Sequence, residues 1–204
     1  GEVMFVWGLA VGSALLDVDP ARGEALLRKL SMYKLRAQVS LEDVSKAHVV
    51  LVSGSPFEDA APDPRLAALG WSGLANSGAH ARGEEWMLGR RIAEGVPDLA
   101  IDATPEEVFG LEALLEELNG VAFAKGCFVG QENVSRMKRR ATTRKKFCPL
   151  VFEGPPPPPG TPVRAGEAEL GTVRSGSVGR AIAFLRLDRA QEAGDRGATL
   201  FAGE

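Results

Sequence analysis

The segment from residue 125 to residue 132, which reads KGCFVGQE, contains the residue types best suited to chemistry. A cysteine reacts as its thiolate, and a neighbouring cation lowers the pKa of the thiol. Lys125 stands two residues before Cys127, and side chains at that spacing share a face when the segment is extended. The pattern predicts a reactive thiol at Cys127 with Lys125 as its electrostatic partner. A small buried cysteine in a tight turn is the alternative that the residues alone leave open.

The residues around this cysteine predict the shape of the loop. Gly126 and Gly130 permit backbone torsions, or a close approach to a flat ligand, that other residues do not. A helix is predicted over residues 131–137, and the N–H groups and dipole at its start favour an anion or thiolate in the loop. Phe128 is interpreted either as a core residue or as a wall of a ligand site.

Basic side chains cluster directly after this segment. Residues 136–146 contain seven Lys or Arg side chains, whereas the whole chain has a formal net charge of −3. We name residues 136–146 the basic run. Such a cluster favours an anionic partner. RNA phosphates, a smaller anion and plain solvation remain alternatives, and only Phe147 beside the run could stack on a base.

Apolar spacing and turn residues predict the elements that position these residues. The predicted strands are residues 3–7, 14–18, 39–41, 48–52 and 69–71, and the predicted helices are residues 25–33, 84–94 and 104–118. Thr104 and Pro105 suit the cap and first turn of the last helix. Strands separated by amphipathic helices predict an α+β fold.

The end of the chain has a different pattern. The segment of residues 154–162, with five consecutive prolines at residues 155–159, is interpreted as a stiff connector. Short β-rich runs follow at residues 170–173, 180–185 and 199–201, which predicts a small antiparallel β-barrel. We therefore predict one domain over residues 1–146 and a second over residues 147–204.

Composition excludes several classes of protein. No apolar run approaches the roughly 18 residues of a membrane helix, and we expect no secretory signal. Two cysteines cannot form a disulfide scaffold, nor enclose a four-cysteine zinc or iron–sulfur site alone. We therefore predict no metal site within the chain. The low cysteine count favours a reducing compartment, and we predict a cytoplasmic location.

The segment KGCFVGQE resembles the K-G-C-aromatic-x-G-Q-E signature of the YgfZ family of folate-binding proteins. That family belongs to the glycine-cleavage T-protein (aminomethyltransferase) superfamily. The runs MYKLRAQVSLED, PRLAALGW and RRIAEGVPD resemble further family segments in the same order. The resemblance implies T-protein-like α+β lobes, a C-terminal β-barrel and a further segment before Gly1. It also implies a bound tetrahydrofolate, or a one-carbon derivative, and a role in iron–sulfur cluster assembly or repair.

The same resemblance implies roles for individual residues. Cys127 and Lys125 match the thiol and the basic residue of the signature and are the predicted catalytic pair. The predicted cofactor-binding residues are Gly126, Phe128, Gly130, Gln131, Glu132, Trp71, Arg91 and Arg136. The basic run would hold the anionic glutamate tail of the folate. Implied partners are iron–sulfur proteins or their assembly machinery.

One departure from the superfamily bears on catalysis. Residues 91–95 read RIAEG, and Ala93 stands where aminomethyltransferases have the glutamate expected to recognise the pterin. Folate-dependent aminomethyl transfer is therefore the weaker alternative, and whether the protein is an enzyme stays open. Association with RNA through the basic run is a further alternative. We expect a monomer without a membrane partner.

Overall fold

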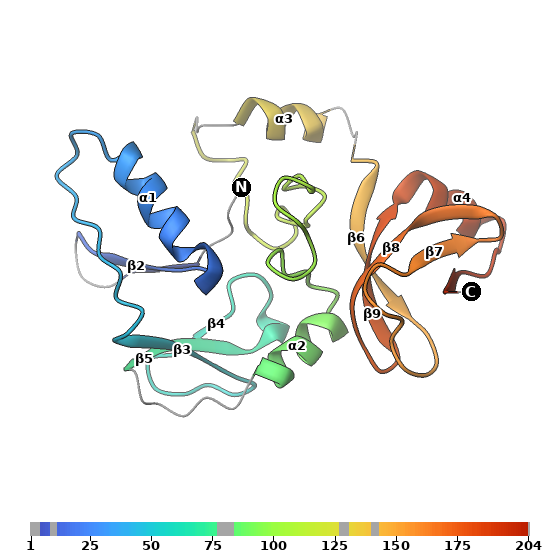
Figure 1. Cartoon of the computed structure of the whole chain (residues 1–204), viewed down its shortest axis with the longest axis horizontal. Helices are drawn as coiled ribbons and strands as arrows, with labels where there is room; N and C mark the ends of the chain where they lie inside the picture. The colour runs from blue at the N-terminus through green and yellow to red at the C-terminus, as the bar shows by residue number, and fades with distance from the viewer. Residues whose placement is uncertain (1–4, 9–11, 77–83, 127–130, 140–142, 204) are drawn as a thin grey trace. The chain divides into compact units, whose positions relative to one another are not determined.

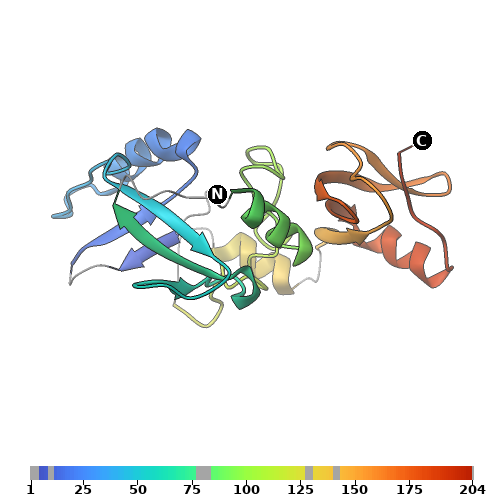
Figure 2. The same cartoon turned by 90° about the horizontal axis from the view of Figure 1, so that it is seen from below.

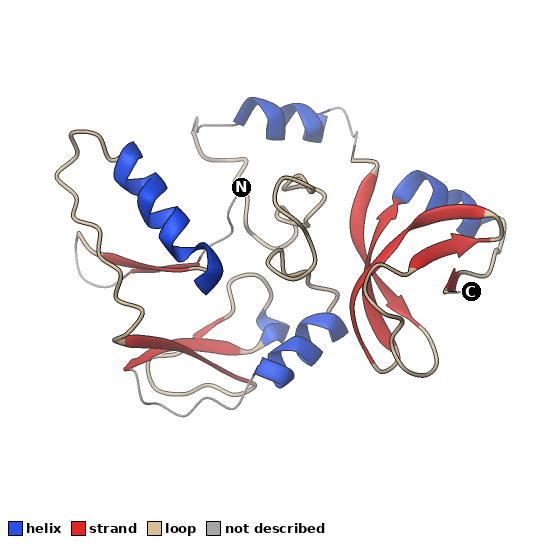
Figure 3. Ribbon diagram, viewed as in Figure 1, coloured by secondary structure: helices blue, strands red, loops and turns tan. Residues whose placement is uncertain are grey.

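The computed structural model describes residues 5–8, 12–76, 84–126, 131–139 and 143–203. Residues 2–61 and 70–83 form one compact unit, called unit 2, and residues 62–69 and 84–204 form another, called unit 1. Both contain helices and antiparallel strands (Figures 1 and 3), so the predicted α+β class is confirmed. T-protein-like lobes and the domain boundary at residue 147 stay predictions. None of the described helices has the length and apolar content that crossing a membrane requires.

The first part of the chain contains a hairpin, a helix and a three-stranded sheet. Its elements are β1 (Phe5–Gly8), β2 (Ala14–Asp17), η1 (Pro20–Arg22), α1 (Gly23–Tyr33), β3 (His48–Ser53), β4 (Ala61–Pro62), η2 (Ala67–Leu69) and β5 (Trp71–Asn76). The strands predicted at residues 3–7 and 14–18 are confirmed as β1 and β2, which pair antiparallel in a hairpin, although residues 3 and 4 lie outside the described residues. The sheet has the order β3-β5-β4, with His48 opposite Asn76.

The predicted strand over residues 39–41 is wrong, because this stretch is irregular. The Lys34 ammonium donates to the Val39 carbonyl oxygen at 3.2 Å and so uses an acceptor that a strand would need. The Val39 side chain is also about half exposed, so this stretch does not bury an apolar face as a strand in a sheet does. The strand predicted at residues 69–71 begins only at Trp71, since Leu69 ends the 3-10 turn η2.

Unit 1 contains a C-terminal antiparallel sheet of the order β10-β7-β8-β9-β6. Its elements are α2 (Glu84–Ala93), α3 (Gln131–Arg139), β6 (Lys145–Val151), β7 (Pro162–Ala165), β8 (Ala168–Ser177), β9 (Arg180–Arg186), α4 (Leu187–Asp195) and β10 (Phe201–Ala202). The sequence did not predict α4, which packs against β6, β8 and β9 (Figure 2). The predicted strands near residues 170, 180 and 200 are confirmed.

The inner strand β9, which lies between β8 and β6, is buried on both faces. Ala181, Ala183 and Leu185 join one apolar cluster, whereas Ile182 and Phe184 join a second cluster. The split follows from the alternation of side chains along a strand. The second cluster also holds Ile92 of α2 and Phe147 of β6, so α2 packs on one face of the sheet.

The predicted helix over residues 104–118 is wrong, because turns replace it. The capping contacts do form: the Thr104 N–H and hydroxyl donate to the Glu107 carboxylate at 2.9 and 3.0 Å. Glu106 and Leu114, however, have positive φ values of 66° and 60°, respectively. These lie in the left-handed region, which a right-handed helix cannot accommodate.

Strand β6 forms one edge of the C-terminal sheet, with β9 as its neighbour. The Phe147 N–H donates to the Glu112 carbonyl oxygen at 3.1 Å, so the turn-rich segment before β6 lies along this edge. Pro149, in the middle of β6, has no N–H to donate. The proline-rich connector follows β6, and the Gly160 N–H after it donates to the Val173 carbonyl oxygen at 2.7 Å.

Candidate functional site

The structure describes only part of the predicted reactive loop. Lys125 and Gly126 are exposed, and a Cβ added at Gly126 would meet nothing within 4 Å. Packing therefore does not require a glycine at this position. Cys127, Phe128 and Gly130 lie outside the described residues, so the predicted pairing of Lys125 with the thiol stays a prediction.

Helix α3 follows the loop as predicted and presents two faces. Gln131 is its first residue. Glu132 and Arg136 are exposed, whereas Val134 and Met137 are half-buried. The spacing of three residues between Val134 and Met137 places both on the inner side of the helix. The predicted ligand residues Glu132 and Arg136 are therefore accessible to a solute.

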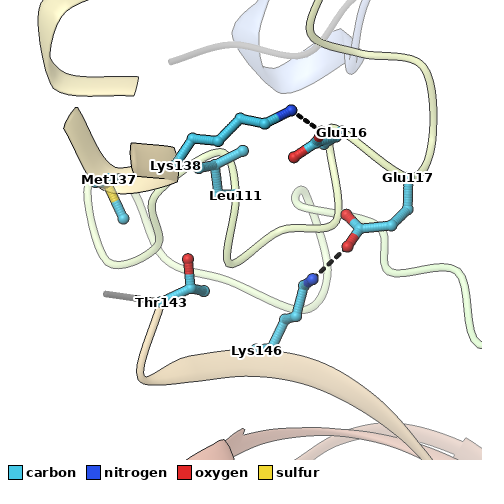
Figure 4. A pocket seen from close by; sticks show the side chains of 7 residues that line it. All are labelled: Leu111, Glu116, Glu117, Met137, Lys138, Thr143 and Lys146. Carbon is cyan, nitrogen blue, oxygen red and sulfur yellow. Dashed lines mark hydrogen bonds and ion pairs between the residues drawn. The ribbon is translucent and has the colours of Figure 1, made fainter. Parts of the chain in front are cut away.

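Beside α3, three segments of unit 1 line a pocket with a volume of about 260 Å³ (Figure 4). The turn-rich segment before the loop, α3 and the start of β6 each contribute side chains. The lining residues are Leu111, Glu116, Glu117, Met137, Lys138, Thr143 and Lys146. We name this the Lys–Glu pocket.

Two ion pairs cross the Lys–Glu pocket. The Lys138 ammonium binds Glu116, and the Lys146 ammonium binds Glu117 (Figure 4). The Lys138 ammonium also lies 3.9 Å from the centroid of the Phe123 ring, a cation–π contact. Burial raises the pKa of Glu117, but hydrogen bonds, chiefly from Lys146, outweigh burial and leave that pKa below its ordinary value. The Glu117 carboxylate is therefore ionised at neutral pH.

These ion pairs divide the basic run into paired and unpaired cations. Lys138 and Lys146 have acidic partners 22 and 29 residues earlier in the chain. Within the part of the chain that the structure describes, Arg136 and Arg144 make no ion pair. Sequence reasoning missed Glu116 and Glu117, and the only signal for them was that acidic residues precede a strongly basic segment.

The predicted ligand residue Arg91 is buried inside unit 1. Its guanidinium Nη1 donates to Asp102 Oδ2 at 2.7 Å and to the Val96 carbonyl oxygen at 3.4 Å, and its Nη2 donates to Ser175 Oγ at 3.2 Å. The Asp98 N–H donates to the same carboxylate oxygen of Asp102 at 2.8 Å. These contacts give Arg91 a structural role, and the cofactor contact expected of it stays a prediction.

The structure also describes Trp71, a predicted cofactor-binding residue, and Cys148, the second cysteine of the chain. Trp71, in unit 2, is half-buried and stands opposite Ser53 in the β3–β5 pair. Cys148 is a free thiol in β6, and burial raises its pKa although Lys146 opposes this effect. Across the described residues no three His, Cys, Asp or Glu side chains group as a metal site would require.

Comparison with known proteins gives the chain a set of relatives. Residues 144–204 match the family model of the CAF17 C-terminal β-barrel domain. The mitochondrial iron–sulfur cluster assembly factor IBA57 of Mus musculus is 32% identical over 203 residues, covering 85% of this chain and 56% of the relative. The Homo sapiens protein of the same name is 30% identical over 202 residues, covering 86% and 57%. The Mycosarcoma maydis homologue is 32% identical over 163 residues, covering 71% and 40%.

These relatives correct the predicted location. All three are named as mitochondrial proteins, which contradicts the cytoplasmic prediction. A low cysteine count favours a reducing compartment but does not distinguish among reducing ones. The chain spans about half the length of the curated relatives it matches. Over that half the chain is similar to the IBA57 iron–sulfur cluster assembly factors, and its residues 144–204 match the model of the CAF17 C-terminal β-barrel domain.

Proposed function

We propose that the protein takes part in iron–sulfur cluster assembly in mitochondria and that it binds tetrahydrofolate as a YgfZ-type relative would. The observation that carries the proposal is the similarity to IBA57 proteins over 85% of this chain. The segment KGCFVGQE supports the same proposal, because its residues suit a reactive thiol. The partners would be iron–sulfur proteins or their assembly machinery.

The chemistry of the two thiols supports Cys127 as the reactive one. Cys148 lies in a paired strand, its Sγ is 3.6 Å from the Lys146 carbonyl oxygen, and burial raises its pKa. A thiol with a raised pKa is a poor nucleophile and a poor iron ligand at neutral pH. Cys127 is therefore the thiol left to act. A four-cysteine cluster would need further ligands from a partner, so the cluster is cargo that the protein helps to place.

The residues near α3 suit part of a folate. Arg136 is an exposed cation of α3, and the Lys–Glu pocket contains the ammonium groups of Lys138 and Lys146. Such cations suit the carboxylates at one end of a folate. At about 260 Å³ the pocket is smaller than the roughly 300–1,000 Å³ of pockets that enclose a drug-sized ligand. It therefore fits the charged end and not the whole molecule. When bound, tetrahydrofolate supplies a carrier for one-carbon groups.

A genetic experiment tests the role of the thiol. Cys127→Ala should abolish support of iron–sulfur enzymes in cells that lack their own copy of the protein, while the variant accumulates to normal levels. Cys148→Ala is the matched control and should restore those enzymes fully, because its thiol is structural. Full complementation by Cys127→Ala would refute the reactive-thiol proposal.

A binding experiment tests the cofactor. Anaerobic calorimetry with tetrahydrofolate should give saturable one-site binding that weakens in Arg136→Glu and is unchanged in Arg189→Glu, an exposed arginine on α4. Absence of heat under conditions where the protein is folded would remove folate from the proposal. The role in cluster assembly would then have to rest on protein partners alone.

A further inference from the structure

We infer that the Lys–Glu pocket binds the carboxylates of a glutamyl group, and that Glu116 and Glu117 compete with that ligand for Lys138 and Lys146. The inference rests on the proposed function, since it names the part of the folate that the pocket takes and the two acids that oppose its entry. The same chemistry would also admit a free glutamyl oligomer.

The competing acids are placed so that a ligand can displace them. The side chains of Glu116 and Glu117 are 40% and 49% exposed, so each carboxylate can turn outward and be hydrated. Exposed ion pairs contribute little to stability, typically about 0.2–1 kcal/mol each. A ligand that brings two carboxylates on one molecule therefore has only a small free energy to overcome.

The remaining lining suits the body of a glutamyl group. Lys138 is held by the Phe123 ring as well as by Glu116, so its ammonium keeps a partner when the acid leaves. Leu111 and Met137 offer apolar surface to methylene groups, and the Thr143 hydroxyl lies among the lining groups as a donor (Figure 4). Two ammonium groups beside an apolar surface match two carboxylates on a short methylene chain.

Calorimetry with the full chain and three probes tests this inference. The probes are tetrahydropteroate, which lacks the glutamyl group, tetrahydrofolate, and tri-γ-glutamate alone. The double variant Glu116→Gln/Glu117→Gln removes both competitors. It should bind tetrahydrofolate and tri-γ-glutamate roughly two- to thirtyfold more tightly than the wild type, as loss of two exposed pairs implies, with tetrahydropteroate unchanged.

Matched variants separate this effect from a general change in charge. Glu85→Gln/Glu106→Gln removes two exposed acids outside the pocket and should leave all affinities unchanged. Lys138→Ala/Lys146→Ala should abolish binding of tri-γ-glutamate. If the double Gln variant does not fold, Glu117→Gln alone keeps the Lys138–Glu116 pair and should still give part of the gain.

The outcomes distinguish the inference from the proposed function. Equal affinity of wild type and Glu116→Gln/Glu117→Gln for both glutamyl probes would overturn the inference, and so would an equal gain for tetrahydropteroate. Tetrahydropteroate and tetrahydrofolate binding alike would leave folate binding intact and the pocket without a role. Tighter tri-γ-glutamate binding without any binding of the two pterins would support the pocket and refute the folate.

Discussion

Replacing Asp102 with alanine is expected to destabilise unit 1 by about 3–5 kcal/mol, the usual effect of removing one partner from a buried ion pair. The Asp102 side chain is 0% exposed and that of Arg91 is 4% exposed. Without the carboxylate, the guanidinium keeps only the Val96 carbonyl at 3.4 Å and the Ser175 hydroxyl at 3.2 Å. The Asp98 N–H loses its acceptor as well. These losses are a large fraction of a typical folding free energy of about 5–15 kcal/mol.

Thermal and urea unfolding would measure this loss. For a chain of this size 1 kcal/mol shifts Tm by about 2–4 °C, so Asp102→Ala should lower Tm by roughly 6–20 °C. The double variant Arg91→Met/Asp102→Leu should recover most of the loss, because an apolar pair of similar volume replaces a buried ion pair at little cost. A single variant within 1 kcal/mol of the wild type would refute the reasoning. The double variant also tests the cofactor role expected of Arg91, which predicts lost folate binding in a stable protein.

Three further predictions concern unit 1. Gly171→Ala should destabilise unit 1 strongly, because the added Cβ would lie 2.0 Å from a carbonyl oxygen of β9. Gly194→Ala in α4 meets open space and should stabilise the protein by about 0.5–1 kcal/mol. Equal urea midpoints for the two variants would contradict both expectations. Burial raises the pKa of Glu107, but hydrogen bonds leave that pKa below the ordinary 4.5. The stability difference between the wild type and Glu107→Gln should therefore persist above pH 4.5 and disappear as the pH falls below the folded pKa. A stability difference that grew on acidification would contradict this prediction. In Cys127→Ala, iodoacetamide at pH 8 should alkylate Cys148 far more slowly in the native than in the urea-unfolded protein, because burial raises its pKa; similar rates would show an accessible thiol.

The elements that could be predicted from the sequence are those whose signal is local. The run from Ala181 to Leu185 is apolar and β-rich, and it becomes the doubly buried strand β9. The helix expected after Thr104 fails for the opposite reason. Its cap is a local signal and forms. The path of the chain beyond the cap is set by tertiary packing, because Ala113 and Leu115 join the second apolar cluster. The sequence did not predict α4, because its residues are mostly polar and Gly194 lies inside it.

For the candidate site, the sequence predicted cations but not their partners. The basic run is visible as composition, and α3 corresponds to the helix predicted over residues 131–137. The pairing of Lys138 with Glu116 joins residues 22 positions apart, and that of Arg91 with Asp102 joins residues 11 positions apart across a turn. Such contacts depend on tertiary packing, which single-residue patterns do not encode. The family resemblance names Arg91 as a cofactor-binding residue, and nothing in the sequence indicated that its side chain is buried beside Asp102.

The hydrogen bond from Phe147 to the Glu112 carbonyl also bears on how the protein avoids self-association. An edge strand with unpaired N–H groups invites pairing with another chain. Here one N–H of β6 is taken by the turn-rich segment, Pro149 has none, and Lys145 places a charge at the start of the strand. The turn-rich segment thus covers part of the edge of β6 and hinders its pairing with a strand of another molecule. Variants that loosen it would aggregate before they lose the native sheet.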